Sequence, residues 1–174
     1  MNPRPPTIAR SRRQPVINLA RASLPPVWRA AQLRYEAPHL RTHLEFRSNA
    51  FPAEPGEEEQ VNPGRWGRAL ADYLRSELNS RNLPGGEPYA EDWGWAVPID
   101  NEQFPLWVGC GNYEEYDDGF LCFIEPRKPT IRRLFRKIHT AQRVAEVASA
   151  LESALRAHPG VKELRWWSED EAGA

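Results

Sequence analysis

Short stretches of alternating apolar and polar residues run through the middle and the end of this chain, and this period of two predicts β-strands. In residues 42–47, Leu44 and Phe46 alternate with three polar residues, which is the pattern of a half-buried strand. Three strands at short intervals, which favour two consecutive hairpins, and a last strand are predicted further along the chain. They span residues 93–99, 104–111, 119–125 and 161–167.

Two longer stretches carry apolar residues at helical spacing and predict amphipathic helices over residues 64–80 and 141–157. Asn62-Pro63 is a typical start for the first helix, because Asn caps free N–H groups and Pro tolerates the first helical position. Thr140 is the corresponding cap of the second helix.

A third, shorter amphipathic helix is predicted between the last two of these segments. Its apolar side is formed by Ile131, Leu134, Phe135 and Ile138, and its other side is basic. The element order is therefore β-α-β-β-β-(α)-α-β. It predicts an α+β fold, with a mainly antiparallel sheet of four to five strands and two main helices packed on one face.

The pattern also predicts which residues share a face of the sheet, if Ile99 pairs with Phe104 and Asn112 with Phe120. The helix-facing side then carries Trp93, Trp95, Val97, Ile99, Phe104, Leu106, Val108, Cys110, Phe120, Cys122 and Ile124. The other side carries Gly94, Ala96, Pro98, Trp107, Gly109, Gly111, Leu121 and Phe123, which are small or apolar instead of polar. We therefore expect either a cover over this second face or an exposed interaction patch.

Charge and composition divide the chain into three parts. Residues 1–34 contain seven Arg and no acid, whereas the remainder has 16 basic and 24 acidic residues. Many prolines and no sustained period predict a flexible or extended Arg/Pro-rich arm over residues 1–38. Residues 39–168 are predicted to form a single α+β domain, and residues 169–174 an acidic tail. The arm has three interpretations: nucleic-acid contact, an organelle transit peptide, or a misplaced start codon.

Several functional classes find no support in the sequence. The chain has no apolar run of the ~18–20 residues that span a membrane and no secretory signal, so we expect a cytoplasmic protein that contacts no membrane. Cys110 and Cys122 are interpreted as buried thiols, with a disulfide or redox pair as the alternative. His39 and His43 are four residues apart at a strand start, where no metal site is expected. We find no catalytic motif and predict a non-enzyme without cofactors.

Acidic residues are concentrated in loops, where the simplest interpretation is solubility. A sharper interpretation is a docking surface for a basic protein, because charge steers association and aromatic side chains anchor it. The predicted partner-binding residues are Tyr113, Glu114, Glu115, Tyr116, Asp117, Asp118, Trp107, Phe123, Glu91 and Asp92.

Residues 127–137 contribute six positive charges, for which two interpretations are open. They bind phosphate groups, or they pair with acidic loops of the same molecule. The nucleic-acid alternative would use Arg10, Arg12, Arg13, Arg132, Arg133, Arg136 and Lys137.

Residues 91–126 contain the segments Glu-Asp-Trp-Gly-Trp, Leu-Trp-Val-Gly-Cys-Gly-Asn-Tyr and Phe-Leu-Cys-Phe-Ile-Glu-Pro. In these segments the chain resembles small uncharacterised bacterial α/β proteins, some of which are similar to immunity proteins of toxin systems. This resemblance implies a cytosolic protein that binds and blocks a cognate toxin. We therefore predict a non-enzymatic protein-binding module, of immunity or inhibitor type, that occludes a basic site on its partner. A nucleic-acid-associated protein and an enzyme with an unrecognised site are the alternatives.

Overall fold

A computed structural model describes residues 40–168 of the chain. The predicted arm (residues 1–38), the acidic tail (169–174) and His39 lie outside the described residues. The strands of the main sheet are β1 (Arg41–Ser48), β2 (Tyr89–Glu91), β3 (Gly94–Ile99), β4 (Leu106–Asn112), β5 (Gly119–Glu125) and β8 (Val161–Ser168). A separate two-stranded sheet contains β6 (Thr130–Arg133) and β7 (Arg136–His139), and the helices are η1 (Glu57–Glu59), α2 (Arg68–Ser80) and α3 (Ala141–Ala157).

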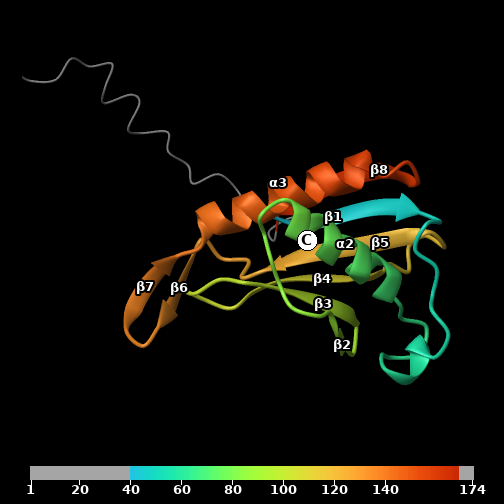
Figure 1. Cartoon of the computed structure of the whole chain (residues 1–174), viewed down its shortest axis with the longest axis horizontal. Helices are drawn as coiled ribbons and strands as arrows, with labels where there is room; N and C mark the ends of the chain where they lie inside the picture. The colour runs from blue at the N-terminus through green and yellow to red at the C-terminus, as the bar shows by residue number, and fades with distance from the viewer. Residues whose placement is uncertain (1–39, 169–174) are drawn as a thin grey trace, which may run out of the picture. The chain divides into compact units, whose positions relative to one another are not determined.

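The main sheet has six antiparallel strands in the order β2-β3-β4-β5-β1-β8. The predicted α+β class, the antiparallel sheet and the two main helices are confirmed, but the strand count is higher than the four to five expected. The short strand β2 was not predicted. It extends the meander on one side, while β1 and β8 extend it on the other (Figure 1).

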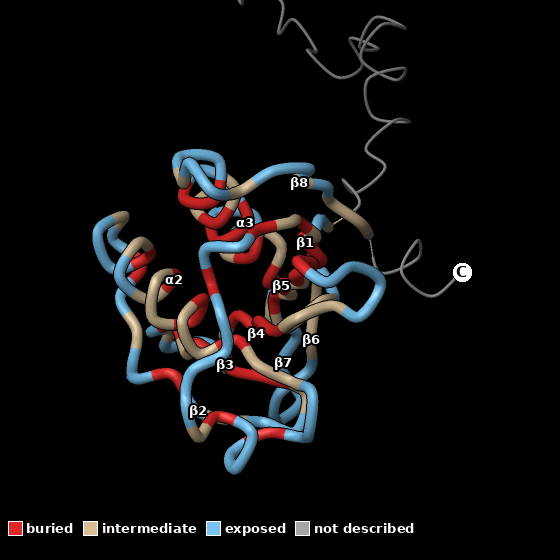
Figure 2. Tube along the Cα trace, turned by 90° about the vertical axis from the view of Figure 1, so that its right-hand side faces the viewer, coloured by how far each residue is buried: buried red, intermediate tan, exposed pale blue. Residues whose placement is uncertain are grey.

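Both main helices lie on the same face of the sheet, so a single core fills the space between (Figure 2). α2 packs over β3 and β4, and α3 packs over β1, β5 and β8. The core includes Leu44 and Phe46 from β1, as the alternation predicted. We call the opposite side of the sheet, which neither helix covers, the open face.

The start of α2 differs from the prediction. Asn62 caps no helix, because Gly64 has a φ of 79° and Arg65 closes a turn back to the Asn62 carbonyl at 2.9 Å. The helix begins only at Arg68, and its first N–H groups are bound by the carboxylate of Glu57. A remote side chain therefore does the capping that we assigned to the local sequence.

The predicted strand faces are confirmed with one exception. Asn112 pairs with Phe120 as expected, whereas Ile99 pairs with Leu106, two residues beyond the expected Phe104. A shift of two preserves the side-chain faces. Trp93 was wrongly placed on the core side. It precedes Gly94, whose φ of 146° interrupts the alternation, and its ring contacts Trp107 on the open face.

The predicted short helix over residues 131–138 is wrong, because these residues form the β6–β7 hairpin, which we call the basic hairpin (residues 130–139). Ile131 pairs with Ile138 and both pack against the core at the base of the hairpin. In Figure 1 the hairpin projects beyond the end of the main sheet, near the first turn of α3. Among the described residues, no helix is long and apolar enough to span a membrane.

Candidate functional site

Three aromatic rings meet in the middle of the open face, and we call them the aromatic cluster: Trp93, Trp107 and Phe123. The indole rings of Trp93 and Trp107 stack with centroids 5.9 Å apart, and Phe123 lies 4.8 Å from Trp93 and 5.5 Å from Trp107. All three side chains are half-buried. Such rings provide a large contact area with little conformational entropy to lose on binding.

Gly109 makes room for this cluster. A Cβ atom at this position would lie 2.4 Å from the Phe123 ring and 2.8 Å from the Trp93 ring, so any larger residue would force these rings to move. The rings therefore lie directly across the backbone of β4. Gly109 is thus the small residue on this face over which aromatic side chains from neighbouring segments pack.

Cations already contact aromatic rings on this face. The guanidinium of Arg127 lies 5.5 Å from the centre of Phe123, and that of Arg165 lies 3.7 Å from Trp167. The Trp167 indole N–H donates to Glu45 Oε2 at 3.0 Å. The face therefore combines aromatic surface with carboxylates, a chemistry that attracts Arg and Lys side chains.

The acidic loop, residues 113–118, supplies less free charge than its composition suggests. Asp118 is buried and accepts from Arg47 Nε at 2.7 Å, and its other carboxylate oxygen lies 3.0 Å from Lys162 Nζ. The hydrogen bond from Arg47, followed by that from Lys162, holds the pKa of Asp118 below its usual range. This carboxylate therefore joins the loop to β1 and β8.

Other members of the loop also have internal partners. Glu114 forms an ion pair of 2.9 Å with Arg65, and Tyr116 lies under the Arg47 guanidinium at 4.7 Å. The Tyr113 hydroxyl donates to Glu115 at 3.0 Å, and this bond raises the pKa of Tyr113. Asp117 is exposed.

The predicted partner-binding residues fall into two groups on the sheet. Trp107 is opposite Glu125, whereas the acidic loop follows β4 beyond Asn112 and so lies at the other end of these strands. Glu91 and Asp92 are exposed in and after β2, where Gly94 approaches Gly111 near that same end. Trp93 connects the groups, since it follows Asp92 in sequence and its ring joins Trp107.

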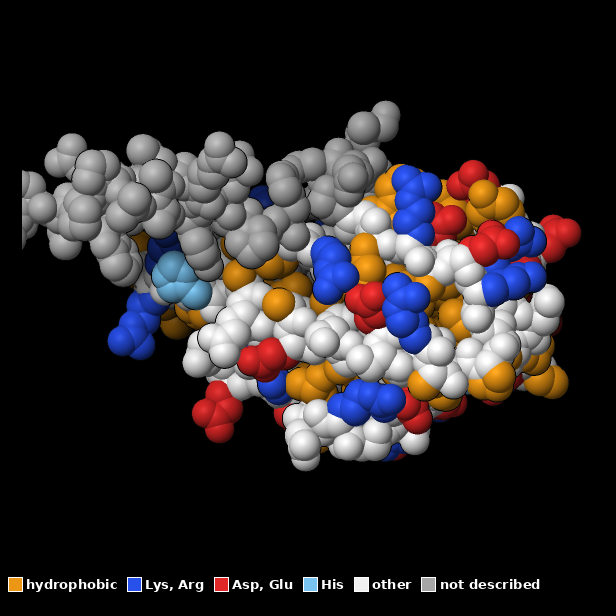
Figure 3. Space-filling view, turned by 90° about the horizontal axis from the view of Figure 1, so that it is seen from above, with side chains coloured by type: hydrophobic (Ala, Val, Ile, Leu, Met, Phe, Trp, Pro, Cys, Tyr) orange, Lys and Arg blue, Asp and Glu red, His pale blue; other side chains and the backbone are white. Residues whose placement is uncertain are grey.

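The basic residues show a sharp division. Arg127 pairs at 2.5 Å with Glu125, the last residue of β5, instead of with one of the acidic loops. Among the described residues the hairpin shows no such pairing: Arg132, Arg133, Arg136 and Lys137 are exposed and form no ion pair there, while the acidic tail lies outside the described residues. Elsewhere, Lys and Arg side chains commonly lie beside Asp and Glu, as on the face seen in Figure 3. Arg10, Arg12 and Arg13 lie outside the described residues.

The two cysteines are direct cross-strand partners on the core side of β4 and β5, and both are free and buried. Burial raises the pKa of each thiol well above its usual range, which disfavours the nucleophilic thiolate. Over residues 40–168, no group of three or more His, Cys, Asp and Glu side chains is arranged to hold a metal ion.

Sequence reasoning missed two features that the structure brings out. Glu57 belongs to the acidic loop residues for which solubility was the simplest interpretation, yet it is buried, and nothing nearby in the sequence signals its distant partners. Leu134 and Phe135 were assigned to a buried helix face, but they form the exposed tip of the hairpin. A signal for the hairpin exists, because apolar and basic residues are arranged symmetrically about Leu134-Phe135.

Comparison of the chain with protein-family models, with curated proteins and with solved structures gives no match. Its function therefore has to be argued from its own residues.

Proposed function

We propose that this chain is a non-enzymatic protein-binding module that docks a basic protein segment on its open face. The observation that carries the proposal is the aromatic cluster of Trp93, Trp107 and Phe123, which is half-buried on the sheet face opposite α2 and α3. A sheet with one solvated face ordinarily carries polar side chains there. Aromatic anchors on such a face are typical of interaction surfaces.

Charge favours a basic partner. Residues 35–174 contain 24 acidic and 16 basic side chains. Glu91 and Asp92 are exposed beside Trp93, so a partner Arg or Lys that stacks on the indoles would meet carboxylates at the rim. The contacts of Arg127 with Phe123 and of Arg165 with Trp167 are internal examples of the same chemistry.

The specific form that we propose is an inhibitor or immunity-type protein, which acts by covering a basic site on a cognate toxin. Its mechanism is occlusion, and it needs no catalytic group on this chain. The acidic loop contributes mainly through Asp117, because Asp118 is committed to Arg47 and Lys162 within the molecule. Long-range attraction between the acidic domain and a basic partner would speed association.

The test begins with capture of a partner by the tagged full chain, followed by affinity measurements with that partner in purified form. The informative variants are Trp107→Ala and the double variant Glu91→Lys/Asp92→Lys. The matched control is Glu58→Lys/Glu59→Lys, which makes the same charge change at two exposed residues in η1. We expect at least a tenfold loss of affinity in the first two variants and less than a twofold change in the control.

Circular dichroism and thermal unfolding of each variant show whether the fold is retained. A captured protein that binds the two open-face variants as tightly as the wild type would overturn the proposal. Equal losses of affinity in the test and control charge variants would mean that the partner is attracted nonspecifically by negative charge. That result would also count against the open face as the binding site.

A further inference from the structure

The basic hairpin differs in charge from the open face and forms a separate candidate binding surface. Its strands carry Arg132 and Arg133 on one side of the turn and Arg136 and Lys137 on the other, and all four are exposed and form no ion pair with any described residue. The domain around them is acidic and pairs many of its cations. Such a concentration of free positive charge suits an anionic partner.

The hairpin sequence works against the stability of the hairpin. The register places Arg132 opposite Lys137 and Arg133 opposite Arg136, and like charges directly opposite destabilise a strand pair. Leu134 and Phe135 occupy the turn with φ of 46° and 67°, where a two-residue turn of this kind favours Asn-Gly. Local choices that cost stability in this way are typical of functional positions.

The tip itself is apolar and open to solvent. The exposed fractions of Leu134 and Phe135 are 84% and 105%, so the Phe135 ring makes essentially no packing contact with its own protein. An unpacked aromatic ring between free cations can stack on a nucleobase, and this stacking is tolerant of base sequence.

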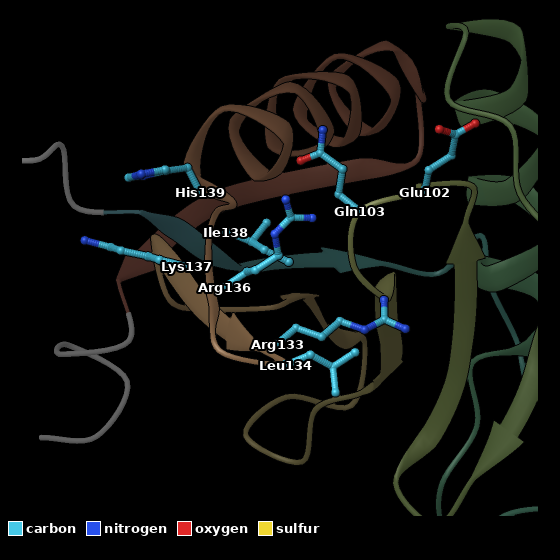
Figure 4. Close-up of a pocket in the computed structure, with 8 residues that line it drawn as sticks. All are labelled: Glu102, Gln103, Arg133, Leu134, Arg136, Lys137, Ile138 and His139. Carbon is cyan, nitrogen blue, oxygen red and sulfur yellow. The ribbon is translucent and has the colours of Figure 1, made fainter.

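A hollow lies beside the hairpin. Its volume is about 660 Å³, and Glu102 and Gln103 from the β3–β4 loop face Arg133, Leu134, Arg136 and Ile138 across it (Figure 4). This volume falls within the roughly 300–1,000 Å³ of small-ligand sites, enough for a nucleotide unit. Lys137 and His139 also line the hollow, and in Figure 4 their side chains extend to the side opposite that of Arg133, so the hairpin presents positive charge on two sides.

We propose that the basic hairpin binds single-stranded nucleic acid. Arg132, Arg133, Arg136 and Lys137 contact backbone phosphates, Phe135 stacks on an unpaired base, and the hollow receives an adjoining nucleotide. A nucleic-acid strand uses both the exposed tip and the hollow beside the hairpin. A planar lipid surface that received the tip would leave the hollow empty, and it is therefore the less favoured partner. The inference uses residues outside the open face and does not depend on the proposed function.

The test measures binding of the full chain to a fluorescein-labelled 15-nucleotide oligo(dT) by fluorescence anisotropy across a range of NaCl concentrations. The double variant Arg133→Gln/Arg136→Gln removes two phosphate contacts and a like-charge pair, so it cannot lose binding by weakening the hairpin. We expect the slope of log K against log salt to become shallower by about 1.4, since each single-strand phosphate contact contributes about 0.7. The matched control is Arg143→Gln/Arg156→Gln, which removes two cations of α3 that have acidic partners; its slope should equal that of the wild type.

The double variant Leu134→Asn/Phe135→Gly separates stacking from folding. It installs residues that the turn prefers, so the hairpin persists while the stacking ring is lost, and we expect about a tenfold weaker binding. Binding unchanged in both hairpin variants would overturn the proposal and leave the N-terminal Arg residues as the binding segment. Binding of a 15-base-pair duplex as tightly as the single strand would overturn it as well. Hairpin-dependent binding to phosphatidylserine vesicles, with hairpin-independent binding of the oligonucleotide, would replace it with a membrane contact.

Discussion

Glu57 and the basic hairpin are charged regions of one domain, but the charge of Glu57 is buried and hydrogen-bonded whereas the charges of the hairpin are exposed. Glu57 is 2% exposed, and its Oε1 accepts from Gly67 N at 2.6 Å, Arg68 N at 2.7 Å and Trp95 Nε1 at 2.7 Å. Its Oε2 accepts from Glu54 N at 2.9 Å. The hairpin cations are exposed, opposed by like charges and form no ion pair with a described residue. Charge that is fully bound inside a protein serves the fold, whereas charge held free at a structural cost is available to a partner.

The largest expected change in stability follows from removal of the Glu57 carboxylate. Glu57→Ala leaves three backbone N–H groups and an indole N–H without their acceptor, near the positive end of α2. We expect the free energy of unfolding, measured with urea, to fall by about 3–5 kcal/mol. The exposed neighbour Glu58 is the control, and Glu58→Ala should change the free energy of unfolding by less than about 0.5 kcal/mol. Similar values for both variants would show that Glu57 is not the structural centre of this region.

At the tip of the hairpin, by contrast, we expect substitution to increase stability. Leu134→Asn/Phe135→Gly relieves two left-handed positions that carry bulky side chains, and should stabilise the hairpin by about 1–2 kcal/mol. Hydrogen exchange of the amides in residues 130–139 measures this locally, and it should become slower. Leu134→Asn alone, which relieves one position, should give part of the effect. Faster exchange in the double variant would mean that the apolar tip stabilises the hairpin, and the contrast with Glu57 would then fail.

These two regions also mark where sequence reasoning succeeds and fails. The bounds of α3 and β5 were predicted correctly, because their periods are local and their ends carry ordinary stop signals. Glu57 was unpredictable, since three of its four partners lie 10, 11 and 38 residues away and are brought together only by the folded sheet and helix. The hairpin was missed because Ile131, Leu134, Phe135 and Ile138 fit a helical spacing as well as a mirror-symmetric turn.

The candidate site divides in the same way. Trp107 and Phe123 were correctly placed on one face because alternation fixes the side of a strand. Trp93 was misplaced because Gly94 breaks the alternation. The partners of Asp118 were not predicted, because Arg47 and Lys162 come from strands distant in sequence.

Asp118 combines features of Glu57 and of the basic hairpin. Its carboxylate is buried like that of Glu57, but its partners Arg47 and Lys162 are themselves partly exposed. Its pKa is lowered by Arg47 and Lys162, so it contributes stability above the unfolded pKa of about 3.9, and this contribution is lost as the pH falls through the folded value. Asp118→Asn should therefore lower Tm at pH 7, and the difference from the wild type should shrink below about pH 4. The exposed Asp117 provides the control as Asp117→Asn. A difference that stays constant from pH 7 to pH 3 would contradict the ionic role of Asp118.

The smallest expected effect tests whether the hairpin cations repel one another. Arg133→Glu converts the Arg133–Arg136 pair into an opposite-charge pair and should stabilise the hairpin by about 0.2–1 kcal/mol. Slower hydrogen exchange of the Arg136 amide and its neighbours measures the change, and the gain should diminish in 1 M NaCl because salt screens exposed charges. Lys128→Glu makes the same charge change at an exposed residue outside the β6–β7 pairing and should have no such effect. If Arg133→Glu weakens the hairpin, then the opposed cations are not a cost, and their exposure no longer indicates that they are held for a partner.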